Sequence, residues 1–183
     1  MDEAWLSEFR QRLTDFQAER GDGSSTAVSI KVRVSSGCFH REHSPEAYQI
    51  IDRYLAAHPL DPVREEYIEH ESGPEVIAYI ALGAAGLGLA KSIIELITAI
   101  IKARSEGIKK GDKPREALAV IVRGYRNETE YFQETTLRIE NQTAVDSKAV
   151  KQALDGAFKT LTKPNKAQGK PGVPGAAADR PRD

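Results

Sequence analysis

The 183-residue sequence is poor in cysteine and carries no excess of charge of either sign. Its single cysteine excludes an internal disulfide and fits a reducing compartment. The 26 Lys and Arg residues nearly balance 27 Asp and Glu residues, whereas a dedicated nucleic-acid-binding protein usually has a basic excess. The first residues lack the basic and apolar regions of a secretory signal. We therefore expect a chain that is not secreted, is cytoplasmic or associated with the inner membrane, and binds no nucleic acid.

The composition places the chain among folded proteins. With 40% hydrophobic and 29% charged residues, it is neither wholly disordered nor a membrane protein with many spans. Changes in composition divide it into an N-terminal region (1–70), a hydrophobic region (71–110), a third region (111–162) and a tail (163–183). The tail holds four Pro and three Gly in 21 positions, which predicts disorder.

The N-terminal region has clear local patterns. Apolar residues three or four positions apart within residues 1–20 predict an amphipathic helix. Strict alternation over residues 26–35 predicts a strand with one buried face and one wet face. Ser44 followed by Pro45 predicts the start of a second helix, with Ser44 as its cap.

The third region predicts two strands and a closing helix. The apolar run over 118–122 and the alternation over 135–140 are typical of an antiparallel strand pair. Asp146 and Ser147 then precede apolar residues at helical spacing. Together these patterns predict an α+β fold with about four helices, a small antiparallel sheet and one long hydrophobic helix.

We interpret residues 76–101, of which 19 out of 26 are apolar, as this long helix. Lys91 and Glu95 lie one helical turn apart and are placed to pair. Gly83, Gly86 and Gly88 form a small-residue surface that allows close helix–helix approach in water or in lipid. The length suits a membrane span, while the two charges favour a helix buried in protein. Both alternatives remain open at this point.

A phosphate-binding loop is a different interpretation of the same segment. Residues 76–82 would be a buried strand, 83–88 a loop and 90–104 a helix. Gly83 and Gly88 would cradle a phosphate with Lys91 and Ser92, as in the loops of nucleotide-binding proteins. In that motif the Lys follows the second Gly directly, whereas two residues intervene here. The alternative is a small nucleotide-binding switch or enzyme.

A possible metal site follows the first predicted strand. Cys38, His40 and His43 lie within six residues, and Cys and His are the preferred ligands of zinc. Their spacing does not match a familiar zinc finger, and no second Cys pair exists. A polar loop with a free thiol is the other interpretation, and the predicted function names no cofactor.

The order of features in this part of the chain resembles that of a known family. It runs from Glu71-Ser72-Gly73-Pro74-Glu75 through the hydrophobic segment, Lys102-Ala103-Arg104 and the two strands to the Val150–Phe158 helix. It is similar to the effector-associated constant components of bacterial conflict systems. The resemblance covers residues 71–160 and includes no catalytic motif, so it carries over no functional residue. It implies an accessory or adaptor role that links an effector to a membrane.

The function expected from the sequence is therefore a non-enzymatic accessory protein. Its hydrophobic helix over 76–101 would engage a partner, a second copy of the chain or the inner membrane, in a bacterial defence system. Nucleotide binding at residues 83–92 and metal binding by a soluble domain are the alternatives.

Overall fold

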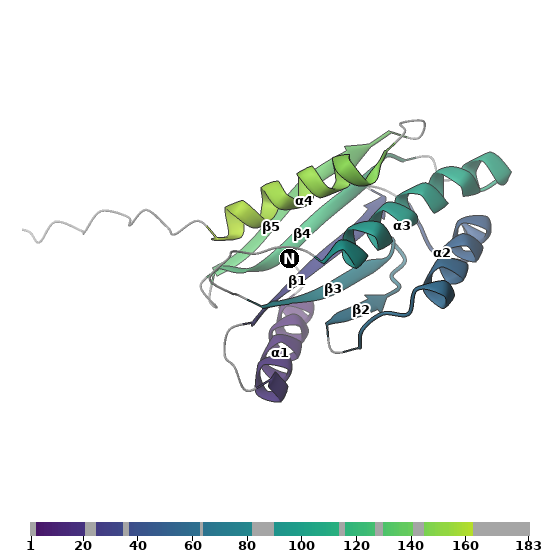
Figure 1. The fold of residues 1–183 in the computed structure, drawn as a ribbon. Helices are drawn as coiled ribbons and strands as arrows, with labels where there is room; N and C mark the ends of the chain where they lie inside the picture. The colour runs from purple at the N-terminus through teal and green to yellow at the C-terminus, as the bar shows by residue number, and fades with distance from the viewer. Residues whose placement is uncertain are drawn as a thin grey trace, which may run out of the picture.

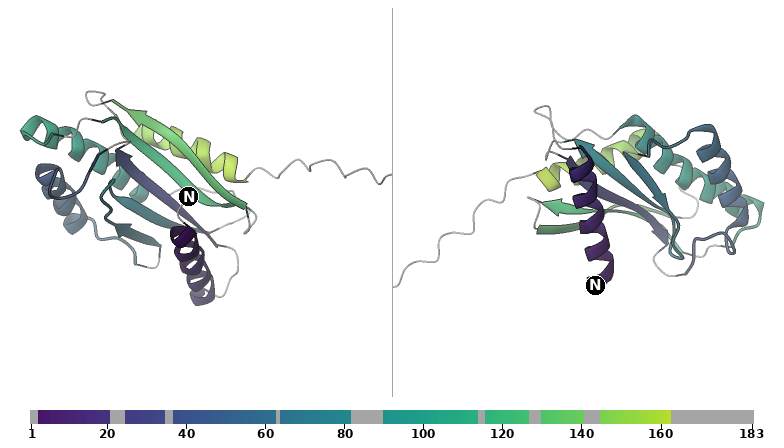
Figure 2. Two further views of the ribbon diagram at one scale, coloured as in Figure 1. Left: turned by 180° about the vertical axis from the view of Figure 1, so that it is seen from behind. Right: turned by 90° about the horizontal axis from the view of Figure 1, so that it is seen from below.

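A five-stranded antiparallel sheet with helices on both faces forms the protein (Figure 1). The computed structural model describes residues 3–20, 25–34, 37–62, 64–81, 90–113, 116–126, 130–140 and 145–162. The elements are α1 (Glu3–Arg20), β1 (Ser25–Val34), α2 (Pro45–Ala57), β2 (Glu65–Ile68), β3 (Glu75–Ala81), α3 (Lys91–Lys110), β4 (Leu118–Arg126), β5 (Glu130–Ile139) and α4 (Ser147–Thr162). Figure 2 shows α1 on the face of the sheet opposite α3 and α4, and α2 packs along α3.

The central strand of the sheet is the first one in the sequence. The strand order is β2-β3-β1-β4-β5, and every neighbouring pair is antiparallel. Since β3 and β4 both run antiparallel to β1, they are parallel to each other with β1 between them. The chain between β3 and β4 includes α3, so these elements form a split β-α-β unit.

The main core lies between the sheet and the three helices α2, α3 and α4. Alternate residues of β1 point into it, and α3 contributes a continuous apolar stripe. These residues are at most 6% exposed: Val28, Ile30, Val32, Val34, Ile93, Ile94, Leu96, Ile97, Ile100 and Ile101. Burying one such side chain stabilises the fold by about 1.5–3 kcal/mol relative to leaving it in water. The hydrophobic face of α3 is therefore buried within the domain.

The segment 76–101 is not one helix, so this prediction is wrong. Residues 75–81 form strand β3, and α3 begins only at Lys91. Val76, Ala78 and Ile80 pack under the helices, while Ile77 packs under α1 on the opposite face. A strand covered on both faces is apolar at consecutive positions, and periodicity alone does not distinguish it from a buried helix. Among the described residues, none of the helices combines the length and apolarity needed to cross a membrane.

Other predictions have mixed outcomes. The α+β class is confirmed, as are helices within 1–20, after Ser44 and after Asp146, and the strands predicted around 26–34, 118–122 and 135–139 are present as β1, β4 and β5. The short strand β2 was missed, because a four-residue strand that begins with two glutamates has no apolar alternation. The predicted tail (163–183) and the glycines Gly83, Gly86 and Gly88 lie outside the described residues.

The start of α2 is held by a residue from beyond α3. Ser44 occupies the cap position, but its hydroxyl makes no capping hydrogen bond. The Asp112 carboxylate instead accepts hydrogen bonds from the backbone N–H groups of Glu46 (3.3 Å) and Ala47 (3.1 Å). A Cβ atom at Gly107 would lie 2.2 Å from Asp112 Oδ2, so this approach requires glycine. The capping contact joins α2 firmly to the end of α3.

Candidate metal centre

The loop between β1 and α2 brings together the three residues that the sequence suggested as metal ligands. Each of Cys38, His40 and His43 offers one ligand atom, and these atoms all lie within 4.8 Å of one another. His40 Nε2 is 3.1 Å from His43 Nδ1, and the two ring centroids are 4.6 Å apart. Cys38 and His40 are partly buried, while His43 is exposed. The site therefore lies at the surface and is open on the side of His43.

The donor set matches the chemistry of a divalent transition metal. Zinc bonds to Cys sulfur at about 2.3 Å and to His nitrogen at about 2.0–2.1 Å, which in a tetrahedron puts donors roughly 3.3–3.6 Å apart. The two ring nitrogens are already near this spacing, and the thiol lies within 4.8 Å of both of them. Three protein ligands leave a fourth position for water or another donor.

Metal binding at His40 would require a change of tautomer. The backbone N–H of Glu42 donates a 3.3 Å hydrogen bond to His40 Nδ1, which leaves the proton of a neutral ring on Nε2. If Nε2 binds a metal, that proton moves to Nδ1, and the bond from Glu42 is lost. The lost bond is long and exposed. Its loss costs little free energy compared with the gain from three metal–ligand bonds.

The backbone of the loop is fixed by contacts on both sides. Gly37 adopts a left-handed conformation (φ +105°), which reverses the chain after β1. Phe39 is fully buried, its carbonyl accepts a 2.9 Å hydrogen bond from the Tyr48 hydroxyl, and its N–H donates to the Glu71 carbonyl at 2.8 Å. The Ser44 N–H donates to the His40 carbonyl at 2.9 Å. Such contacts hold Cys38 and His40 on a preorganised backbone.

Arg41 attaches the same loop to two other parts of the fold. Its Nη1 and Nη2 atoms donate to Asp52 on α2 at 2.6 and 2.7 Å, and its Nε lies 2.9 Å from Glu69 after β2. Its guanidinium lies 5.1 Å from the centre of the Tyr48 ring. The hydrogen bond from Arg41 lowers the pKa of Asp52, and the bonds to Asp52 and Glu69 raise the pKa of Arg41. The sequence analysis missed Arg41, since its partners lie far along the chain.

The residues proposed for a phosphate loop are arranged differently. Lys91 and Ser92 begin α3, and Lys91 Nζ lies 3.3 Å from Glu95 as the one-turn spacing predicted. The Ser92 hydroxyl donates a 2.7 Å hydrogen bond to Glu65 on β2. A phosphate at Ser92 would therefore face a carboxylate.

A buried polar cluster lies on the face of the sheet that α1 covers. Glu75 is fully buried, accepts a short hydrogen bond from the Ser29 hydroxyl, and has Lys31 Nζ and Arg123 Nη1 each 4.0 Å away. His70 Nε2 lies 2.8 Å from the same carboxylate. Burial lowers the pKa of Lys31, against the opposing effect of Glu75.

This cluster corrects one prediction. The alternation over residues 26–35 predicted a strand with one wet face. Ser29 and Lys31 on that face of β1 are instead at most 8% exposed, next to the fully buried Glu75. Tertiary pairing between β1, β3 and β4 buries them, and local alternation does not reveal such pairing.

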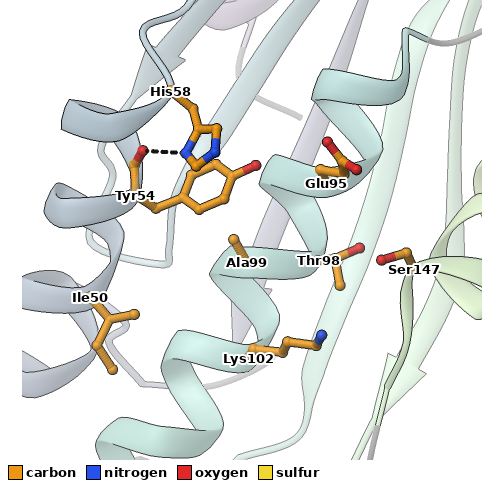
Figure 3. A pocket seen from close by; sticks show the side chains of 8 residues that line it. All are labelled: Ile50, Tyr54, His58, Glu95, Thr98, Ala99, Lys102 and Ser147. Carbon is orange, nitrogen blue, oxygen red and sulfur yellow. Dashed lines mark hydrogen bonds between the residues drawn. The ribbon is translucent and has the colours of Figure 1, made fainter.

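A hollow lies between α2, α3 and the first residue of α4 (Figure 3). Its volume is about 460 Å³. Tyr54 comes from α2, His58 directly follows α2, Glu95 and Lys102 come from α3, and Ser147 comes from α4. Sequence reasoning paired Glu95 with Lys91 and found no pocket, because the walls come from three separate segments.

Comparison with models of known protein families, with curated proteins and with solved structures found no match to this chain.

Proposed function

We propose that this chain is a metal-binding domain in which Cys38, His40 and His43 hold a zinc ion. The observation that carries the proposal is the convergence of one thiol and two imidazoles within 4.8 Å on a loop. Cys and His are the ligands that structural and catalytic zinc sites share. The proposed role is binding, without an assigned reaction.

The surroundings of the loop support this proposal. Phe39 lies in the core directly between Cys38 and His40, so the backbone that carries both ligands has little freedom. Arg41 is bonded to α2 and to the residue after β2, which limits how far the loop can open. A metal ion bound here would gain from ligands that are already held close together.

The test is direct measurement of metal content and ligand identity. We expect purified protein to bind about one zinc ion per chain, and cobalt in its place to show a thiolate-to-metal charge-transfer band. Cys38→Ser should abolish that band, and His43→Ala should weaken binding. His58→Ala is the matched control, because His58 is an exposed histidine that directly follows α2 and lies outside the cluster. Equal metal content and equal spectra in wild type and Cys38→Ser would overturn the proposal.

A second candidate is the accessory role that the resemblance of residues 71–160 implies. The apolar side of α3 is buried in the domain, whereas Lys91, Glu95 and Lys102 on the other side are partly or fully exposed. An adaptor would therefore engage its partner through this polar side of α3. Binding of the protein encoded beside this one should be lost in a Lys91→Glu, Lys102→Glu variant. No binding by wild type, or equal binding by both, would contradict the adaptor role without affecting the metal site.

A further inference from the structure

Cys38 is the one ligand of the proposed metal site whose oxidation state can change. It is the only cysteine of the chain, so no second thiol of the same chain can form a disulfide with it or replace it as a ligand. Within the described part of the chain, the ligand group consists of Cys38, His40 and His43. A metal ion held there therefore depends on a single sulfur for its anionic donor.

Cys38 lies at the boundary between the core and the solvent. The residue is half-buried, and Gly37 beside it is exposed. A Cβ atom added at Gly37 would meet no described atom within 4 Å beyond its chain neighbours. On the other side, Phe39 is fully buried and holds the backbone in the core. A small oxidant can therefore approach Cys38 from the Gly37 side without any opening of the domain.

The ligand set makes metal binding sensitive to the state of this sulfur. Zinc binds cysteine as the thiolate, and the thiolate is also the form that attacks an oxidant. The ligand atoms of His40 and His43 lie within 4.8 Å of the sulfur, but both are neutral donors when they bind a metal. Oxidation of Cys38 would leave only these two ligands. Structural and catalytic zinc sites have at least three protein ligands, so two are too few to retain the ion.

We propose that a hydroperoxide oxidises Cys38 and thereby releases the metal ion, so that the site responds to peroxide. This inference rests on the proposed function, because it concerns the regulation of the same site. The thiolate sulfur attacks one peroxide oxygen, an S–O bond forms and the O–O bond breaks. The sulfur gives up two electrons and becomes a sulfenic acid, and the peroxide takes them, gains a proton from solvent and leaves as an alcohol or as water.

The oxidised state is reversed by thiols from outside the chain. One thiol condenses with the sulfenic acid to form a mixed disulfide, and water leaves. A second thiol attacks this disulfide, becomes part of a new disulfide and returns Cys38 to its reduced form. Because the chain has no other cysteine, it cannot carry out this reduction by itself.

The test uses the full-length protein, loaded with zinc and freed of excess metal. Dilute hydrogen peroxide is added, released zinc is followed with a chromogenic chelator, and oxidation of Cys38 is followed in parallel samples by dimedone trapping and mass spectrometry. We expect release of about one zinc ion per oxidised Cys38, with the same rate constant for both events, and recovery of zinc binding after addition of dithiothreitol. The one methionine of the chain is Met1, so its oxidation is found in a different peptide.

Cys38→His separates oxidation of the sulfur from general damage. Three imidazoles also form zinc sites, and an imidazole gives no sulfenic acid. Held at a zinc concentration that saturates it, this variant should release no zinc under the same treatment. His58→Ala alters a histidine outside the cluster and should respond like the wild type.

The outcomes distinguish this inference from the metal site itself. A wild type that holds no zinc before peroxide is added would refute the metal site and the inference with it. Zinc that stays bound after Cys38 is oxidised, a Cys38 that peroxide leaves unchanged, or equal release from Cys38→His would refute the inference alone. If Cys38→His binds no zinc, the wild type decides, since zinc release faster than oxidation of Cys38 would contradict the inference.

Discussion

The two faces of the sheet bury different kinds of side chains. The face under α2, α3 and α4 is lined by aliphatic side chains from every strand except β2. The other face has a small apolar cluster of Phe9, Ala27, Ile77 and Tyr125 beneath α1, next to the buried charges around Glu75. The same strands thus contribute to a large apolar core on one side and a mixed layer on the other.

The difference shows how buried charge and apolar burial act on stability. An apolar contact stabilises in proportion to the area removed from water, and each loss is local. A buried carboxylate depends on all its neighbours, because removing one partner leaves the others with an uncompensated buried charge. The mixed face should therefore be the more sensitive to a single polar substitution.

Loss of the Glu75 carboxylate is expected to have the largest effect. Glu75→Ala should lower the free energy of unfolding by about 3–5 kcal/mol, because the buried Lys31 then loses the carboxylate that lies 4.0 Å from its Nζ. Urea denaturation measures the change. Replacing Glu75, Lys31 and Arg123 together by Met should recover much of the loss. A single-variant effect below about 1 kcal/mol would show that the cluster behaves as a surface ion pair.

A matched pair of cavity variants compares apolar burial on the two faces. Leu96 and Ile77 are 1% and 2% exposed, and each lies on a different side of the sheet. Leu96→Ala should cost about 2–5 kcal/mol, and Ile77→Ala should fall at the lower end of that range, because Ile77 belongs to the smaller cluster, where α1 can move inward over the cavity. Thermal unfolding of both variants tests the order. A larger loss for Ile77→Ala would reverse the comparison.

Alkaline pH should affect the two faces in opposite directions. Burial raises the pKa of Tyr48, which lies on α2 and faces the main core, above its ordinary 10.0. The unfolded state therefore ionises first, and stability present below pH 10 is lost above it, by about 1.4 kcal/mol per tyrosine at pH 11. Burial lowers the pKa of Lys31 on the mixed face below its ordinary 10.5. The unfolded state then binds more protons, so this group's contribution rises with pH up to about 10.5.

Two variants separate these contributions. Denaturation at several pH values should show a shallower alkaline loss in Tyr48→Phe than in wild type. Lys31→Met should remove the rise just below pH 10.5. Profiles for either variant that run parallel to wild type would show that the residue does not contribute to the pH dependence.

The smallest effect is expected at the surface pair of Lys91 and Glu95, which the sequence spacing predicted. Lys91→Ala should lower the free energy of unfolding by only about 0.3–0.5 kcal/mol, because its pair with Glu95 is exposed and screened by salt. Differential scanning calorimetry at low and high salt measures it. A loss above about 1 kcal/mol would mean that the start of α3 contributes to stability in another way.

Sequence patterns predicted the elements whose polar and apolar residues follow a regular period. The alternation of β1 and the cap region before α2 depend on neighbours in the chain, so they were found. Strand β3 was misassigned because both of its faces are covered, which removes the alternation. The helix boundary at Lys91 coincides with the first charge of the segment and lies one residue from the helix start at 90 in the alternative division into strand, loop and helix.

The candidate sites were predictable to different degrees. Cys38, His40 and His43 are close in sequence, so their residue types sufficed to identify them. Arg41 and its partners, the Glu75 cluster and the pocket of Figure 3 depend on contacts between distant elements, which a single sequence does not specify.

The central place of β1 has a consequence for how the chain folds. Val28 pairs with Ala78 on one side and with Gly124 on the other, both far along the chain. Proteins dominated by such distant pairings fold slowly, because long loops must close before the contacts form. During synthesis β1 leaves the ribosome first and has no neighbour until β3 and then β4 are made. Until then its apolar residues remain exposed, and an unpaired apolar strand is prone to aggregation.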